Sequence, residues 1–129
     1  MDLKLINKLD TYKKSYPYYP LPSNLSPYTE QELDKILMNN KIPQVLYDYL
    51  TKVSRVIYGS GHPSTFDCFI FDCIFSDKEK YKVIELNSGG CATSYVLVLE
   101  GPFEGEVYWT DEDTACCCLQ SKSFTLYIK

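Results

Sequence analysis

The sequence lacks the closely spaced ligand pairs from which structural zinc sites are built. Its only histidine is His62, and no two of its cysteines are spaced as C-x-x-C. Structural zinc sites use such closely spaced ligand pairs, because one short loop must present two ligands to a tetrahedral ion. We therefore expect no metal site in this chain.

Long apolar runs are also missing. A membrane-spanning helix needs about 20 consecutive apolar residues, whereas the longest apolar runs here have the length of a strand. The N-terminal segment has charges every few residues and lacks the apolar core of a signal peptide. These absences predict a cytoplasmic location and no membrane partner. The six cysteines, three of them consecutive at 116–118, are then expected to be reduced thiols.

Positive charge is absent from the whole stretch between Val83 and Ser121. The same stretch holds seven acidic residues, Glu85, Glu100, Glu104, Glu106, Asp111, Glu112 and Asp113. A nucleic-acid-binding protein needs a basic face to neutralise phosphates, so we expect no nucleic-acid partner. The pattern favours a basic protein partner, attracted by complementary charge. The alternative is that these acids only keep an outer sheet face in solution.

The N-terminal half is predicted to be helical. Apolar residues recur at helical spacing from Asp2 to the residue before Pro17, again over 26–40, and again over 42–57, with glycines ending the third helix at 59–61. Residues 16–27 hold four prolines and are predicted to form an extended connector.

The C-terminal half is predicted to form strands. Segments 66–75 and 81–86 fit a hairpin, although a helix over 66–75 is also compatible, and 93–101 and 105–110 fit two further strands. Segment 123–129 fits either a last strand or a short helix. The order predicts a single α+β domain over 1–129, with N-terminal helices packed on one face of a mostly antiparallel, twisted C-terminal sheet. Residues 1–25 supply the first helix and the Pro/Tyr-rich connector, and 26–129 the core.

The stretch Gly89-Gly90-Cys91 raises the possibility of a reactive site. A phosphate-binding loop needs a lysine close behind its glycines, but no lysine follows until Lys122, so we expect no nucleotide or other cofactor. A thiol nucleophile is the other possibility, with Cys91 or Cys68 activated by His62. Cysteine is also a common core residue, and a packing role explains these thiols equally well. We therefore do not predict catalysis.

We instead predict structural turns at the glycines. Gly89 and Gly90 would form the tight turn before the strand over 93–101, and Gly101 and Gly105 would bracket the next turn. Trp109 follows on the next strand, where it serves either as a buried anchor or as an interface residue.

These pieces resemble the SMI1/KNR4, or SUKH, superfamily over roughly residues 26 to 128. The shared features are an apolar-Pro dipeptide between helices, a glycine turn, a glycine pair before a Y-x-L-x-L strand, a G-x-V-Y-x-W strand followed by acids, and a closing Ser-Phe. Here they are Ile42-Pro43, Gly59-Ser60-Gly61, Gly89-Gly90 with Tyr95, Leu97 and Leu99, then Gly105, Val107, Tyr108, Trp109, Asp111 and Asp113, and Ser123-Phe124. The chain departs from the family at Leu37, where glutamate is frequent.

The resemblance implies a domain without enzymatic chemistry. Bacterial members are immunity proteins that neutralise toxins, many of them nucleases, and fungal members are scaffolds in cell-wall signalling, with related domains in viruses. We therefore predict a monomeric or weakly dimeric immunity protein that binds a basic toxin. The predicted binding residues are Glu100, Glu104, Glu106, Trp109, Asp111, Glu112 and Asp113. The alternatives are a regulatory interaction domain without a toxin partner, and an enzyme that uses Cys68, Cys91 or His62.

Overall fold

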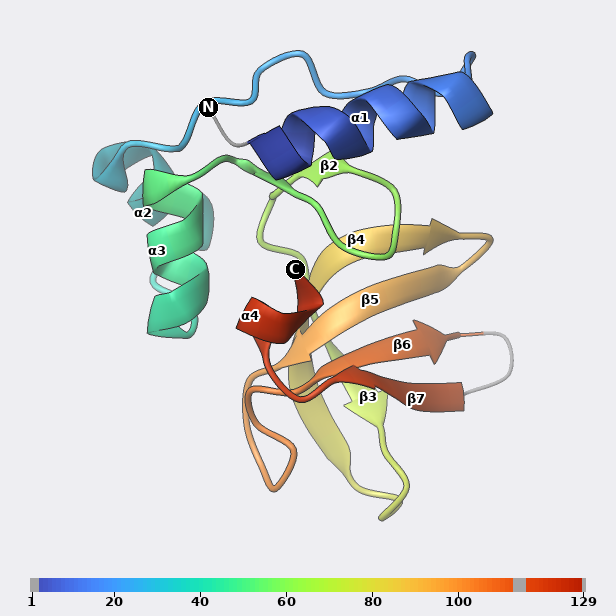
Figure 1. Ribbon diagram of the computed structural model, residues 1–129. Helices are drawn as coiled ribbons and strands as arrows, with labels where there is room; N and C mark the ends of the chain where they lie inside the picture. The colour runs from blue at the N-terminus through green and yellow to red at the C-terminus, as the bar shows by residue number, and fades with distance from the viewer. Residues whose placement is uncertain (1–2, 113–115, 129) are drawn as a thin grey trace.

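The computed structural model describes residues 3–112 and 116–128, which fold into helices followed by a sheet (Figure 1). The helices are α1 (Leu3–Ser15), α2 (Glu30–Leu37), α3 (Gln44–Lys52) and α4 (Phe124–Tyr127). The strands are β1 (Val56–Ile57), β2 (Ser64–Thr65), β3 (Ile70–Ile74), β4 (Lys80–Gly90), β5 (Thr93–Val98), β6 (Val107–Asp111) and β7 (Cys116–Ser121). The predicted α+β class is confirmed.

The sheet is an antiparallel meander in the order β3-β4-β5-β6-β7, and β1 and β2 form a separate small hairpin. The predicted hairpin over 66–86 is present as β3 and β4, so the helical alternative for 66–75 is wrong. The segment after residue 123 is the short helix α4, whose first turn is capped by the Ser123 hydroxyl. Strand β7 was not predicted from the sequence.

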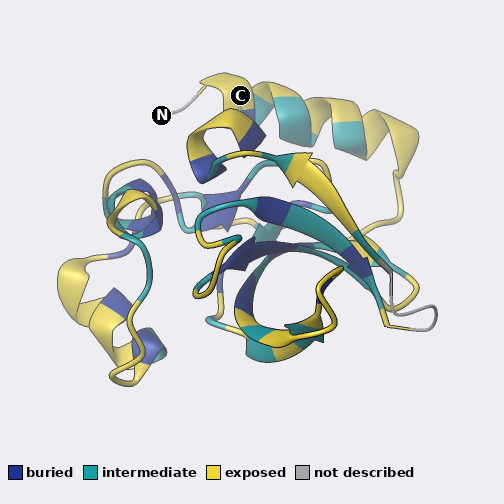
Figure 2. Cartoon of the chain, turned by 90° about the horizontal axis from the view of Figure 1, so that it is seen from below, coloured by how far each residue is buried: buried dark blue, intermediate teal, exposed yellow. Residues whose placement is uncertain are grey.

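The main core lies between the helices and one face of this sheet. Leu33, Leu46 and Leu50 come from the helices and pack on Ile84 and Leu97 from β4 and β5, all of them fully or almost fully buried. Burial of each such side chain contributes about 1.5–3 kcal/mol. The helices therefore hold to the sheet by the apolar stripes that the sequence displays. Helix α1 buries only Leu5 and is otherwise half-buried or exposed (Figure 2).

A second apolar cluster lies on the opposite face of the sheet. It consists of Phe75, Val83, Val96 and Val98, with half-buried aromatic residues around them. The strands curl over this face, so that β3 comes back toward β7 (Figure 1). The thiol of Cys117 on β7 donates to the carbonyl oxygen of Ile74 on β3 at 3.1 Å. The curled sheet thus buries apolar residues on both of its faces.

The third predicted helix is shorter than expected. Helix α3 ends at Lys52, and Val56–Ile57 form β1 instead of continuing the helix. The Ser54 side chain holds the chain in this reversal, since it donates to Leu25 O at 2.7 Å and accepts from the Val56 amide at 2.9 Å. Hydroxyl side chains that bond nearby backbone groups compete with the helical pattern in this way.

The predicted glycine turn lies one step away from its expected place. Gly90 ends β4 with φ +80°, and Gly89 lies inside the strand without a positive φ. The two turn residues are Cys91 and Ala92, with φ 47° and 62°. Gly101 and Gly105, at φ +82° and +87°, lie in the loop between β5 and β6. Each of these last two glycines adopts a conformation that is unfavourable for other residues.

Candidate functional site

The acidic residues predicted to bind a partner lie at two separate ends of β6. Glu100, Glu104 and Glu106 belong to the loop that enters the strand, while Asp111 and Glu112 follow at its far end. Five residue steps of about 3.3 Å separate Glu106 from Asp111, which places the two groups roughly 16 Å apart. Asp113 lies outside the described residues. The structure therefore does not bring the predicted set together as one cluster.

Two of the three glutamates in the first group already have partners. Glu106 pairs with Lys122 at 3.3 Å and accepts from the Tyr108 hydroxyl at 3.0 Å. Glu100 accepts from the Lys82 amide at 2.9 Å. Glu104 is exposed and borders a shallow depression that also includes Lys41. One glutamate of this group is thus paired with a cation, and a second is held by a backbone amide.

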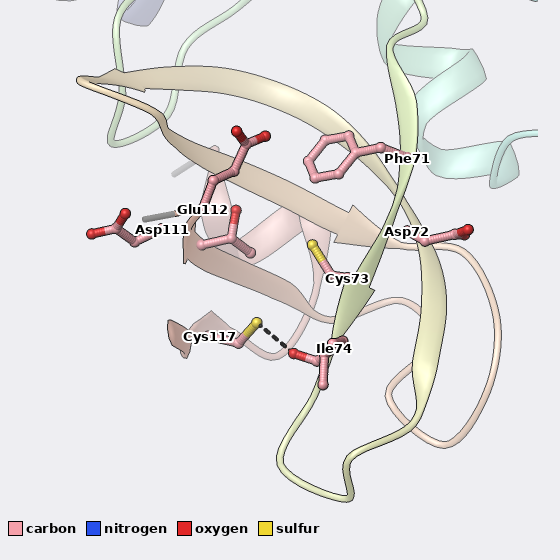
Figure 3. Close-up of a pocket in the computed structure, with 8 residues that line it drawn as sticks. Phe71, Asp72, Cys73, Ile74, Asp111, Glu112 and Cys117 are labelled. Carbon is pink, nitrogen blue, oxygen red and sulfur yellow. Dashed lines mark hydrogen bonds between the residues drawn. The ribbon is translucent and has the colours of Figure 1, made fainter. Parts of the chain in front are cut away.

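The second group borders a pocket of about 300 Å³ between β3 and the paired strands β6 and β7 (Figure 3). Its lining residues are Phe71, Asp72, Cys73, Ile74, Thr110, Asp111, Glu112 and Cys117. None of these described lining residues is a lysine or arginine. Within residues 3–112 and 116–128, neither Asp72 nor Glu112 forms an ion pair.

Strand alternation decides which of these side chains face the pocket. Phe71 and Cys73 point from β3 toward β6 and β7, whereas Asp72 between them points away (Figure 3). Thr110 pairs with Cys117 across β6 and β7, so both residues lie on the same face of the sheet. Asp111 points away from the pocket, while Glu112 lies at its mouth (Figure 3). The interior thus has a phenyl ring, two thiols and a hydroxyl, with one carboxylate at the entrance.

The thiol of Cys73 is chemically quiet. Burial first, and then the neighbouring Cys117 and Glu112, raise its pKa to about 12, against an opposite effect of the Thr110 hydrogen bond. Because the thiolate is the nucleophilic form, Cys73 stays protonated at neutral pH. The pocket is therefore better suited to binding than to thiol chemistry.

Trp109 lies away from this pocket. It pairs with Tyr95 on β5 and with Cys118 on β7, and Tyr95 packs against the main core. Since directly paired residues share a face of the sheet, Trp109 is on the helix-covered face. Trp109 is half-buried there. Its indole nitrogen lies next to Gly89, since a Cβ atom added at Gly89 would be 3.5 Å from it.

The residues of the alternative enzymatic hypothesis show no catalytic arrangement. His62 stacks on Tyr19 at 4.6 Å between ring centres, and its Nε2 lies 3.5 Å from the Tyr12 hydroxyl. Its Nδ1 is buried and has no hydrogen-bond partner within the described part of the chain, so no carboxylate there orients the ring. Burial raises the pKa of the Cys68 thiol, and Cys91 is exposed in the β4–β5 turn.

Within residues 3–112 and 116–128, three or more histidine, cysteine, aspartate or glutamate side chains are nowhere grouped so that they could hold a metal ion. Among the helices of the same residues, none is long and apolar enough to cross a membrane.

Sequence reasoning missed most of the pocket. Phe71, Cys73 and Cys117 were not predicted site residues, because they are remote from the acidic stretch or belong to the strand that was not predicted. The available signal was the density of aromatic and β-branched residues over 66–75, which is typical of a strand. That pattern does not reveal that β3 curls back toward β7.

We compared the chain with protein-family models, with curated proteins and with solved structures, and none of them matches it. The resemblance to the SMI1/KNR4 superfamily therefore stays a prediction that rests on the short motifs in the sequence.

Proposed function

We propose that this chain is a non-enzymatic domain that binds a basic protein through the end of its sheet where β6 meets β7. The observation that carries the proposal is the position of Asp111 and Glu112 beside an open pocket with no lysine or arginine in its described lining. Complementary charge at such a site speeds association and selects the partner. At the other end of β6, Lys122 pairs with Glu106 and the Lys82 amide donates to Glu100.

Immunity toward a toxin is the most specific form of this function. The family resemblance supports it, since bacterial members of the SMI1/KNR4 superfamily neutralise toxins that include nucleases. A nuclease carries a basic cleft for its substrate, and an acidic partner is suited to cover such a cleft. A regulatory interaction domain without a toxin partner is the second candidate, and the same acidic end of the sheet would serve it.

The test is a capture experiment with three baits. The wild-type chain is compared with a double variant, Asp111→Lys and Glu112→Lys, and with a matched control, Glu30→Lys, on the exposed first turn of α2. We expect a basic protein that the wild type and the control retain, that the double variant loses, and that added salt releases. A partner retained equally by all three baits, or unaffected by salt, would contradict the proposal.

Expression of the captured protein then separates the two candidate functions. If the partner is a toxin, its expression alone should stop growth of the host, and co-expression of the wild-type chain should restore growth. The double variant should fail to restore it. A harmless partner that still binds the acidic end of the sheet would favour the regulatory function.

A further inference from the structure

The concave face of the curled sheet is filled at one end and open at the other. At the filled end, Phe75 stacks on Phe103 at 5.2 Å between ring centres, and Tyr108 meets Phe75 edge-on at 5.0 Å. At the open end, the side chains facing inward are mostly short, among them those of Cys73 and Cys117. Short side chains leave the space that the aromatic residues occupy elsewhere, and this space is the pocket of about 300 Å³.

From this geometry we infer that the pocket receives one lysine or arginine side chain of the protein partner. The inference rests on the proposed function and adds the chemistry of the residue that is recognised. Pockets for small molecules usually range from about 300 to 1,000 Å³. The size of this one therefore suits a single inserted side chain better than a larger ligand.

The wall of the pocket matches the stem of such a side chain. Lysine and arginine have apolar stems that pack on apolar surface while their charged ends stay near water. Phe71 offers a half-buried aromatic ring, and the protonated thiol of Cys73 offers a weakly polar surface beside it. A cation near the Phe71 ring would also gain a cation–π attraction.

The mouth of the pocket matches the charged end. The Glu112 carboxylate lies there (Figure 3), and the Thr110 side chain, which forms a hydrogen bond with Cys73, also lines the pocket. The nearby carbonyl of Ile74 already accepts a hydrogen bond from Cys117, at 3.1 Å. Glu112 would repel an acidic side chain, and an apolar side chain would leave its charge unpaired. A lysine or arginine side chain satisfies both parts of the pocket, because its apolar stem packs on the wall and its charged end pairs with Glu112.

The first test uses two short peptides that differ only in their central residue, which is lysine in one and norleucine in the other. Amide signals of the ¹⁵N-labelled chain are followed as each peptide is added. We expect saturable shifts at 71–74, 110–112 and 117 with the lysine peptide only. The variant Glu112→Gln should weaken binding about tenfold, as for loss of a hydrogen bond to a charged group, while Glu104→Gln should not change it. Equal shifts with both peptides, or shifts centred elsewhere, would overturn the inference.

A second test separates this inference from the proposed function. The variant Cys117→Phe fills the pocket without changing any charge, and Cys117→Leu fills it less at the same position. Thermal unfolding identifies which of the two is folded. If a folded filling variant loses the basic partner, the insertion of a side chain is supported. If it keeps the partner while the variant with Asp111→Lys and Glu112→Lys loses it, the acidic surface stands and the pocket inference fails.

Discussion

The hydroxyl of Tyr127 connects the C-terminal helix to the centre of the sheet, and its removal should destabilise the fold measurably. Tyr127 is buried, and its hydroxyl donates to the Asn87 side-chain oxygen at 2.7 Å and accepts from the Ser60 amide at 3.1 Å. Asn87 is itself fully buried and donates to Ile57 O at 2.9 Å and His62 O at 3.1 Å. One side-chain network therefore joins three segments that are distant in the chain: residues 57–62, Asn87 and Tyr127.

The substitution Tyr127→Phe removes one oxygen and leaves the ring in place, so that almost no cavity forms. The Asn87 oxygen then lacks its donor in a buried site, which costs about 1–3 kcal/mol. The Ser60 amide belongs to an exposed residue, and water can replace its partner at little cost. We expect a loss of about 2 kcal/mol. With an unfolding entropy of about 2.1 cal/mol/K per residue over this chain, the melting temperature should fall by about 7 °C.

The assay is thermal and urea unfolding followed by circular dichroism. The matched control is Tyr81→Phe, which removes a hydroxyl that donates to Asp77 at 2.5 Å in an exposed turn. That variant should lose less than about 0.5 kcal/mol, because water replaces an exposed partner. If Tyr127→Phe were no less stable than Tyr81→Phe, the Asn87 network would not contribute as its geometry implies.

Three further measurements test other parts of the structure. Replacing both turn residues, Cys91→Asn with Ala92→Gly, should stabilise the chain by about 1 kcal/mol in urea unfolding, because both occupy positive φ. Alkylation near pH 8, read by mass spectrometry, should modify exposed Cys118 well before Cys73, whose pKa burial raises to about 12; equal rates would contradict that assignment. Burial, and then the Glu106 carboxylate, also raise the pKa of Tyr108 to about 12. The stabilising contribution of the Tyr108 hydroxyl should therefore be complete below pH about 10, the pKa of tyrosine in the unfolded chain, and disappear as the pH rises toward 12. Unfolding curves of the wild type and of Tyr108→Phe, measured over a series of pH values, would show this loss.

The sequence predicted those parts of the fold that depend on local pattern. Thr29 and Glu32 form the reciprocal capping box of α2, with both hydrogen bonds at 3.1 Å, and the Thr-x-x-Glu spacing in the sequence is the local pattern of such a box. Helix α3 was overextended because Val56 and Ile57 continue the apolar spacing of the helix. These two residues are buried as part of strand β1 instead. The helix ends where Ser54 forms hydrogen bonds, one of them with Leu25, which is far away in the chain.

The candidate site was predictable only in part, because sequence proximity and spatial proximity differ along a strand. The acidic residues are close neighbours in sequence, but β6 is extended and carries Glu106 and Asp111 to opposite ends. The pocket brings together β3 and β7, which are about 40 residues apart and do not pair in the sheet. Only the curvature of the sheet creates that neighbourhood, and the spacing of apolar and polar residues along a strand does not specify curvature.

The glycine pair contributes to that curvature. The pairing of β4 with β5 is irregular between Glu85 and Asn87 and again between Ser88 and Gly90, and such bulges bend a strand and increase its twist. A Cβ atom at Gly89 would come within 2.3 Å of the Thr93 hydroxyl oxygen, so a larger residue there would force the Thr93 side chain to move. The glycine pair thus allows irregular pairing at the end of the longest strand, where β4 turns into β5.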